Sequence, residues 1–226
     1  MARVSVVIPL LNEAESIGVV VGSMPWALSV ECVVVDNGST DGSAEIARAA
    51  GARVVTSERG YGAAMFAGCR AAQESSDVIV CMDGDGSDVV AEMPLLLGPI
   101  ERGEADFVIG SRIRGTREAG SMLGSQVLAG WLIGGMVRLL YGFRYTDMGP
   151  FRAIRREALE AMKMREMTYG WNLEMQIKAV TMGLRVVEVP VSYRRRIGGV
   201  SKVSGDLRAS VKAAVRIFGV FWRVRK

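Results

Sequence analysis

Three aspartates follow a short apolar run in the first half of the chain. Residues 78–82 are apolar and mostly β-branched over the length of one strand, and Asp83, Asp85 and Asp88 follow within six residues. Hard divalent cations such as Mg²⁺ or Mn²⁺ prefer oxygen ligands, often one or two carboxylates together with substrate phosphates. We therefore expect Asp83 and Asp85 to hold such a cation, with an acidic turn that caps the next helix as the alternative. For Asp88 alone the turn is the favoured interpretation.

A second chemical signal is the absence of histidine. The chain has 226 residues, of which 50% are hydrophobic and 23% charged, and none is histidine. This excludes Ser-His-Asp triads, histidine metal sites and acid–base catalysis by histidine. The length fits one domain, or one domain with an appendage.

The C-terminal segment carries an excess of positive charge. Residues 193–226 contain ten lysines or arginines, and Asp206 is their single acid. Such a one-sided segment binds phosphate, whether in a nucleotide, a lipid surface or nucleic acid. Apolar residues at spacings of three or four within 206–223 predict a basic amphipathic helix. We assign it to an appendage of residues 205–226 at a membrane surface, behind a domain of residues 1–204. Nucleic acid is not expected as a partner, because aromatic residues suited to base stacking are not interleaved with the bases.

Cysteine usage and the apolar runs bear on the compartment. Cys32, Cys69 and Cys81 are odd in number and widely spaced, which is typical of reduced core residues in a cytoplasmic protein. The N-terminus enters a strand at once, without the pattern of a signal peptide. The longest apolar run, residues 127–137, is too short to span a bilayer. Residues 121–143 are therefore either a buried helix pair or a membrane-facing surface, and we expect a peripheral protein at the cytoplasmic, inner face of the membrane.

Strand and helix patterns alternate through the first half of the chain. Five apolar runs each end on polar or glycine residues, at 4–10, 30–35, 53–56, 78–82 and 106–110. This alternation predicts right-handed crossovers and an α/β fold with a doubly wound, mostly parallel, Rossmann-like sheet. The carboxyl ends of parallel strands share one edge, so four polar clusters should meet there, at 9–13, 36–41, 83–88 and 110–112. Neither a G-x-G-x-x-G fingerprint nor a P-loop is present.

The second half of the chain predicts fewer elements. Residues 147–152 have the composition of a turn, 156–164 and 171–182 have helical patterns, and 184–191 have the pattern of a strand. A basic loop from Arg194 to Lys202 comes next, ahead of the amphipathic segment.

Six short motifs occur in order along the chain. They are Val7-Ile-Pro-Leu-Leu-Asn-Glu13, Val34-Val-Asp-Asn-Gly-Ser-Thr-Asp-Gly42, Met82-Asp-Gly-Asp85, Ile109-Gly-Ser-Arg112, Asp147-Met-Gly-Pro-Phe-Arg-Ala153 and Glu188-Val-Pro to Ser201-Lys202. Together they resemble the family-two glycosyltransferases with the GT-A fold, and within that family the dolichol- or polyprenol-phosphate mannosyl- and glucosyltransferases. The resemblance implies an inverting enzyme that moves a hexose from a UDP- or GDP-sugar to polyprenyl phosphate, with Mg²⁺ or Mn²⁺ as cofactor.

The resemblance assigns the nucleoside to the first two clusters. Pro9, Leu11 and Glu13 would line the nucleoside site, and Val34 and Asp36 would hold the base and the ribose. A carboxylate at a strand end is well suited to accept a hydrogen bond from a ribose hydroxyl or a base N–H.

The resemblance assigns the cation to the acidic cluster. Asp83 and Asp85, with Gly84 between them, match the family's D-x-D and would hold a cation that bridges the donor diphosphate. Ser87 stands where a glutamine commonly follows, so the third ligand is open between Ser87, Asp88 and water.

Basic residues later in the chain match the family's phosphate contacts. Arg112 would lie near the donor or acceptor phosphate, while Arg196 and Lys202 would contact the diphosphate from the loop after the last strand. Asp147 is a candidate for orienting the sugar or assisting the acceptor, with a turn residue as the alternative. Asp85, Arg112 and Asp147 are thus the expected catalytic residues.

A lipid phosphate would simplify the chemistry. Its oxygen is already anionic at pH 7, so direct attack on the anomeric carbon with inversion needs no strong base, which fits a chain without histidine. Two alternatives remain open. One is a soluble or glycan acceptor, with Asp147 as the base. The other is a nucleotide-binding protein without turnover.

Three positions depart from the family pattern. Asn37 replaces the usual second aspartate of D-D-G-S, Ser87 replaces the glutamine, and Gly149-Pro-Phe151 replaces S-G-F. The last departure bears on the identity of the donor sugar.

Overall fold

A single seven-stranded sheet runs through the computed structural model, which describes residues 2–28, 30–198, 219–221 and 223. Across the sheet the strands lie in the order β3-β2-β1-β4-β6-β5-β7. Their bounds are β1 Val4–Leu10, β2 Val30–Asp36, β3 Arg53–Thr56, β4 Val78–Cys81, β5 Phe107–Ser111, β6 Arg152–Arg155 and β7 Val186–Pro190. All pairings are parallel except those of β6 with β4 and β5. The expected mostly parallel sheet is confirmed.

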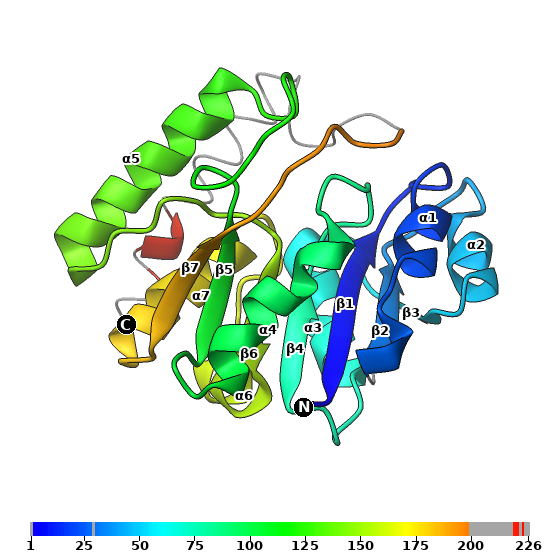
Figure 1. Ribbon diagram of the computed structural model, residues 1–226, viewed down its shortest axis with the longest axis horizontal. Helices are drawn as coiled ribbons and strands as arrows, with labels where there is room; N and C mark the ends of the chain where they lie inside the picture. Colours follow the sequence, from blue (N-terminus) through cyan, green and yellow to red (C-terminus); the bar gives the residue numbers. More distant parts are fainter. Residues whose placement is uncertain (1, 29, 199–218, 222, 224–226) are drawn as a thin grey trace.

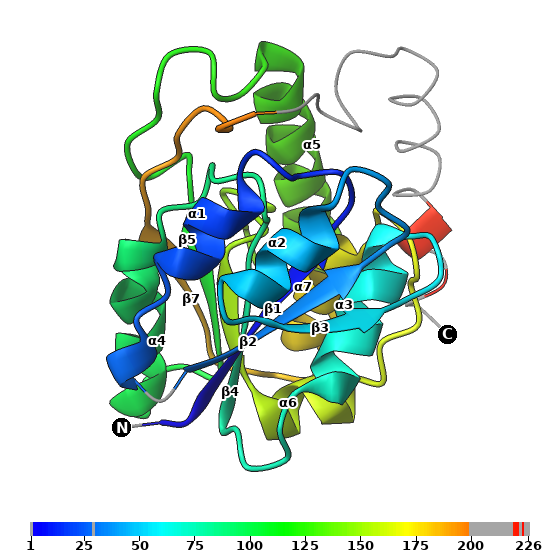
Figure 2. The ribbon, with the colours of Figure 1, turned by 90° about the vertical axis from the view of Figure 1, so that its right-hand side faces the viewer.

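Helices cover both faces of the sheet (Figures 1 and 2). Their bounds are α1 Ile17–Gly22, α2 Ser43–Ala49, α3 Tyr61–Ala71, α4 Met93–Glu101, α5 Gly124–Tyr141, α6 Arg156–Met162 and α7 Trp171–Thr181, with 3₁₀ turns at Trp26–Leu28 and Val90–Glu92. One apolar core joins α1, α2 and α4 to the sheet, and a second core joins α3, α5, α6 and α7 to its other face. The β-branched runs of β1, β2 and β4 are buried between the two cores, as a doubly wound fold requires.

Strand β6 was not expected from the sequence, which predicts a turn up to residue 152. It inserts antiparallel between β4 and β5, with Ala153 opposite both Val80 and Val108. Its Arg152 is fully buried. The guanidinium donates to the Gly149 carbonyl at 3.1 Å and lies 5.7 Å from the Phe107 ring centre. Two arginines in four residues hide the strand pattern in the sequence, because the burial of Arg152 depends on the Asn172 carbonyl and the Phe107 ring, which other elements supply.

Residues 121–143 were predicted to form either a buried helix pair or a membrane-facing surface. The structure shows one helix here, α5, with a buried side and an exposed side. Ile133, Gly134 and Val137 are buried, and a Cβ at Gly134 would lie 2.3 Å from the Tyr145 carbonyl oxygen. On the other side Trp131 is 62% exposed. Among the described residues, no helix is both long and apolar enough to cross a membrane.

Most of the predicted appendage, 205–226, and Lys202 lie outside the described residues. Residues 219–221 and 223 are helical and pack against the body. Val220 is buried beside Gly170, and Phe221 stacks on Tyr141 with ring centres 6.5 Å apart. At least this end of the segment is therefore anchored to the domain.

Candidate functional site

Loops from the carboxyl ends of β1, β2, β4 and β5 meet at one edge of the sheet, at the top of Figure 1. The Asn37 N–H donates to the Leu10 carbonyl at 2.8 Å, which joins the first two loops. The Ser16 hydroxyl donates to the Gly84 carbonyl at 2.9 Å, which joins the first to the third. The four polar clusters predicted to share this edge therefore do so.

One part of the edge, which we call the amide half, consists of residues 9–14, 36–42 and 57–60. The Asn37 side chain donates to the Gly60 carbonyl at 2.9 Å and accepts from the Gly60 N–H at 3.2 Å. The amide serves both partners, whereas an ionised carboxylate has no proton to donate. This pair explains why asparagine replaces the aspartate that is usual at this position.

Further hydrogen bonds connect the first two loops of the amide half. Asn12, which has a positive φ of 51°, accepts from the Thr40 N–H at 2.8 Å and donates its own N–H to the Ser39 hydroxyl at 3.1 Å. The Ala14 N–H donates to Asp41 at 3.0 Å. Hydrogen bonds thus hold together two loops that are 27 residues apart in the sequence.

Four of the predicted nucleoside contacts differ in how far their side chains are buried. Pro9, Leu11 and Asp36 are half-buried at the edge, and one Asp36 oxygen accepts from the Ser39 N–H at 2.9 Å. Val34 differs, because its side chain is 0% exposed and belongs to the core. Val34 can therefore shape the strand beneath the site but presents no side-chain surface to a ligand.

The other part of the edge, which we call the acidic half, consists of residues 83–88, Arg112, Asp147 and 193–198. At its centre, one oxygen of Asp85 accepts from the Ser87 N–H at 2.9 Å and from the Ser87 hydroxyl at 2.5 Å. The other oxygen accepts from Arg196 at 2.7 Å. Ser87 is 2% exposed. Its hydroxyl orients Asp85 in this structure, where the sequence had suggested a direct metal ligand.

Two more carboxyl groups crowd this centre. The Asp83 N–H donates to one oxygen of Asp88 at 3.1 Å, while the other, buried oxygen of Asp88 has no hydrogen-bond partner among the described residues. Burial, followed by repulsion from Asp88 and Asp85, raises the pKa of Asp83 well above its usual range. Burial raises the pKa of Asp88 to about 7, and repulsion from Asp85 and Asp147 adds to the effect.

This donor set fits a divalent cation. Crowded carboxyl groups with raised pKa values and an unsatisfied buried oxygen would all be stabilised by a nearby positive charge. Within the described ranges no three carboxylates or thiolates surround a common metal position. A cation held by Asp83 and Asp85 would complete its shell with phosphate or water, as Mg²⁺ usually does.

Gly84, which lies between the two aspartates, has a packing role. A Cβ at this position would lie 3.0 Å from Ile8 and 3.3 Å from Ile17. Glycine therefore lets the acidic turn pack closely on β1 and α1, where a larger residue would press against both isoleucines.

Arg112 and Asp147 form a closed pair on the far side of the acidic half. Arg112 donates from Nε and Nη2 to the two oxygens of Asp147, at 2.7 Å each, and its backbone N–H donates at 2.9 Å. Asp147 is 4% exposed, and the Tyr193 ring centre lies 4.8 Å from the guanidinium carbon. Burial lowers the pKa of Arg112, but the bonds to Asp147 outweigh it and raise the pKa. Asp147 is thus an anchor for Arg112, a role that the sequence did not suggest.

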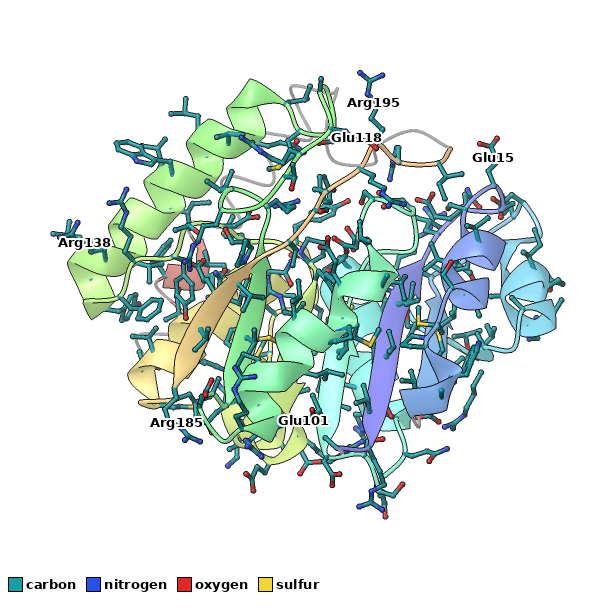
Figure 3. All side chains as sticks on the ribbon, viewed as in Figure 1. Glu15, Glu101, Glu118, Arg138, Arg185 and Arg195 are labelled. Atoms are coloured by element: carbon teal, nitrogen blue, oxygen red, sulfur yellow. The ribbon has the colours of Figure 1, made fainter. Side chains whose placement is uncertain are left out.

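A segment after β7, residues 193–198, crosses over the acidic turn, as the orange trace in Figure 1 shows. We call it the crossing segment. The N–H groups of Arg194 and Ile197 donate to the carbonyls of Ser87 and Asp85 at 2.9 and 3.0 Å. At one end Arg195 lies beside Glu118, and the other end lies near Glu15 (Figure 3). This path brings the Arg196 guanidinium to the Asp85 carboxylate.

Two contributors to the site were missed from the sequence. Tyr193 was overlooked because the guanidinium that lies on its ring belongs to Arg112, which is far away in the sequence. Glu118, which accepts from the Arg195 N–H at 2.8 Å, sits in a loop with no pattern of its own.

The chain is similar in sequence to several glycosyltransferases. The family model described as glycosyl transferase family 2 matches residues 5–163. An uncharacterized glycosyltransferase of Mycobacterium tuberculosis is 38% identical over 224 residues, which cover 98% of this chain and 97% of that protein. An undecaprenyl-phosphate mannosyltransferase of Micrococcus luteus is 33% identical over 234 residues, covering 96% of this chain and 94% of that protein.

A solved structure has the same fold. Glucosyl-3-phosphoglycerate synthase from Mycobacterium tuberculosis, in complex with Mn²⁺, UDP-glucose and phosphoglyceric acid, superposes with a TM-score of 0.75. The two sequences are 22% identical, and the match covers 99% of this chain and 79% of that chain. Likeness at this identity establishes the fold alone, and it confirms the expected GT-A class.

Proposed function

This chain belongs to glycosyl transferase family 2, and we propose that it transfers a hexose from a UDP- or GDP-sugar to polyprenyl phosphate with inversion at the anomeric carbon. The observation that carries the choice of acceptor is the Arg112–Asp147 pair. Both oxygens of Asp147 are bonded to Arg112, so this carboxylate is poorly placed to deprotonate an acceptor hydroxyl. A phosphate acceptor needs no such base.

The donor would lie along the edge from the amide half to the acidic half. Asp36 can accept from a ribose hydroxyl, and Pro9 and Leu11 lie at the end of the neighbouring strand β1. Asp83 and Asp85 would hold Mg²⁺ or Mn²⁺, which when bound supplies Lewis-acid stabilisation to the departing diphosphate. The Mn²⁺ and UDP-glucose bound in the structural neighbour support this arrangement.

The chain itself supplies the fixed charges for the acceptor. Arg112 keeps its positive charge and its orientation because Asp147 and Tyr193 hold the guanidinium from two sides. A guanidinium held in this way can contact an anionic acceptor without first losing side-chain entropy. The Micrococcus luteus relative, named for undecaprenyl phosphate, supports a lipid phosphate as that acceptor.

A lipid acceptor implies contact with a membrane, and α5 offers a surface for it. Leu128 is 57% exposed, Trp131 62%, Leu132 52% and Leu139 83%, all on the outward side of this helix. Exposed aliphatic and tryptophan side chains on one side of a helix suit the lipid–water interface. Cys32, Cys69 and Cys81 are free thiols, which supports the cytoplasmic face of that membrane.

Transfer can be tested with a panel of UDP- and GDP-hexoses and Mn²⁺, with and without a short polyprenyl phosphate. We expect one donor to give a glycosylated lipid phosphate, and its turnover to require the lipid. Turnover of a donor that is indifferent to the lipid would instead indicate a soluble acceptor. Binding of a nucleotide sugar without turnover under any condition would indicate a non-catalytic protein.

Membrane contact through α5 has a separate test. Trp131→Ser combined with Leu132→Ser should reduce sedimentation with vesicles of phosphatidylglycerol and phosphatidylethanolamine by roughly tenfold, because two apolar side chains lose their insertion energy. Trp26→Ser is the matched control, since Trp26 is 43% exposed and lies far from α5 at the opposite edge of the sheet. Equal losses for both variants would contradict a specific role of α5.

A further inference from the structure

Arg196 stands between two carboxylates at the centre of the acidic half. Its Nη2 lies 2.7 Å from Asp85 and 3.7 Å from Glu13. Both carboxylate side chains are almost wholly buried, at 11% and 9% exposure, whereas the Arg196 side chain is 27% exposed. The charge that neutralises Asp85 in this structure is thus the guanidinium.

The same guanidinium has an unused donor. Its Nη1 is buried but makes no hydrogen bond with any described residue. Buried donors in proteins are almost always paired, so an orphan at a site edge indicates a missing acceptor. Oxygens of a phosphate are the acceptors that a guanidinium fork suits best.

The backbone around Arg196 is fixed, but its side chain is not enclosed. The Ile197 N–H donates to the Asp85 carbonyl at 3.0 Å and the Arg194 N–H donates to the Ser87 carbonyl at 2.9 Å, so hydrogen bonds hold the main chain on both sides of Arg196. The Ile197 side chain also closes over Gly86, where a Cβ would lie 2.4 Å from it. A change of partner at Asp85 therefore requires rotation of one side chain, while the crossing segment stays in place.

We propose that Arg196 holds the place of the divalent cation at Asp85 until a donor binds. When donor and cation enter, the cation takes the Asp85 oxygen, and the guanidinium turns to the donor diphosphate, which satisfies Nη1 as well. This inference rests on the proposed use of a nucleotide-diphosphate donor. The binding of the cation and the binding of the diphosphate then depend on each other. The diphosphate draws the Arg196 guanidinium away from Asp85, and the cation neutralises Asp85 in its place.

Two consequences distinguish this exchange from a plain phosphate contact. The cation alone should bind weakly, since it competes with an internal positive charge. Nucleotide and cation should strengthen each other's binding by the same factor, as linkage requires, and that factor should contain a contribution from Arg196.

The test is a titration with Mn²⁺, followed by electron paramagnetic resonance of the free ion, without nucleotide. Arg196→Gln should bind Mn²⁺ alone roughly tenfold more tightly than the wild type, and the factor by which Mn²⁺ tightens UDP or GDP should fall by roughly tenfold. Arg196→Lys should lie between them, because a positive charge remains near Asp85. Arg194→Gln is the matched control in the same segment, since Arg194 is exposed and its side chain has no ion pair among the described residues.

The outcomes separate the inference from the proposed function. Unchanged Mn²⁺ affinity in Arg196→Gln would overturn the exchange, whether or not nucleotides bind. An equal gain in Arg194→Gln would overturn it too, because a general change of net charge would then suffice. If neither UDP nor GDP binds the wild type in the presence of Mn²⁺, the proposed donor fails, while the Mn²⁺ titration still decides the competition between Arg196 and the cation.

Discussion

The two halves of the functional edge are stabilised in opposite ways. In the amide half, Asn37 and Asn12 pair with backbone groups of neighbouring loops, and Asp41 accepts from the Ala14 N–H. In the acidic half, two carboxyl groups have raised pKa values, and the buried oxygen of Asp88 and the Nη1 of Arg196 have no hydrogen-bond partner in the described part.

This difference shows which part of the site is complete without a ligand. Neutral hydrogen bonds between loops each contribute about 1 kcal/mol and fix a shape before anything binds. Buried carboxyl groups destabilise their surroundings until a positive charge reaches them. We infer that the amide half is preformed for the neutral part of a ligand, whereas the acidic half is built for a ligand that brings positive charge with its phosphates.

Asp85→Asn should have the largest effect among the substitutions that test this difference between the two halves. The amide oxygen can still accept from Ser87, so the turn should fold, but the negative charge at the proposed cation site is lost. We expect transfer to fall by roughly a thousandfold, corresponding to about 4 kcal/mol of transition-state stabilisation. The assay is initial-rate transfer, with the melting temperature as a control for folding. Transfer within twofold of the wild type would rule out a cation at Asp85.

A second substitution tests whether Asp147 anchors Arg112. Asp147→Ala leaves a mostly buried guanidinium without its partner, which should cost about 3–5 kcal/mol of unfolding free energy. The double variant Arg112→Gln with Asp147→Ala should lose less than the sum of the single losses, as measured by chemical denaturation. Additive losses would contradict the anchoring role. Loss of activity with unchanged stability would restore Asp147 as a candidate base.

The pH dependence of stability tests the crowding in the acidic half. Below about pH 4 the Asp88 carboxyl is protonated in both states. Between about pH 4 and 7 it ionises only in the unfolded state, because its folded pKa is raised to about 7, so stability falls as pH rises. Above pH 7 the loss stays constant.

Asp88→Asn removes this titration and keeps an acceptor for the Asp83 N–H. In a chelating buffer at pH 8 we expect the variant to be more stable than the wild type by about 4 kcal/mol, relative to the difference at pH 4. Denaturation at both pH values measures it. Parallel curves of stability against pH for the two proteins would show that the pKa of Asp88 is not raised in the folded protein.

The smallest expected effect is in the amide half. Asn37→Asp removes the donor to the Gly60 carbonyl and places a charge beside it, which should cost about 1–2 kcal/mol at pH 7. Below pH 4 the new carboxyl is protonated and can donate again, so part of the stability should return. Thermal denaturation across this range provides the measurement, and equal stability at pH 7 would mean that the pair does not hold the loops together.

The sequence was most informative where neighbouring residues determine structure. The β-branched runs of β1, β2 and β4 and the polar clusters behind them predicted the sheet and its functional edge. The acidic cluster was also recognisable, because Asp83 and Asp85 lie within three residues of each other.

Features that depend on distant partners could not be predicted in this way. Arg152 in β6 is buried with its guanidinium against the Asn172 carbonyl and the Phe107 ring, which other elements supply. The anchoring of Arg112 by Asp147 joins residues 35 positions apart. Val34 illustrates the reverse case, since the side chain of a residue within a recognisable motif lies in the core.

The most direct test of the division between the two halves is calorimetry with nucleoside mono- and diphosphates, in the presence and absence of Mn²⁺. We expect Mn²⁺ to tighten the binding of UDP or GDP by more than about tenfold and to leave UMP or GMP almost unchanged, because only a diphosphate reaches from the amide half to the acidic half. If Mn²⁺ has the same effect on mono- and diphosphates, or no effect on either, the acidic half is not the diphosphate and cation site.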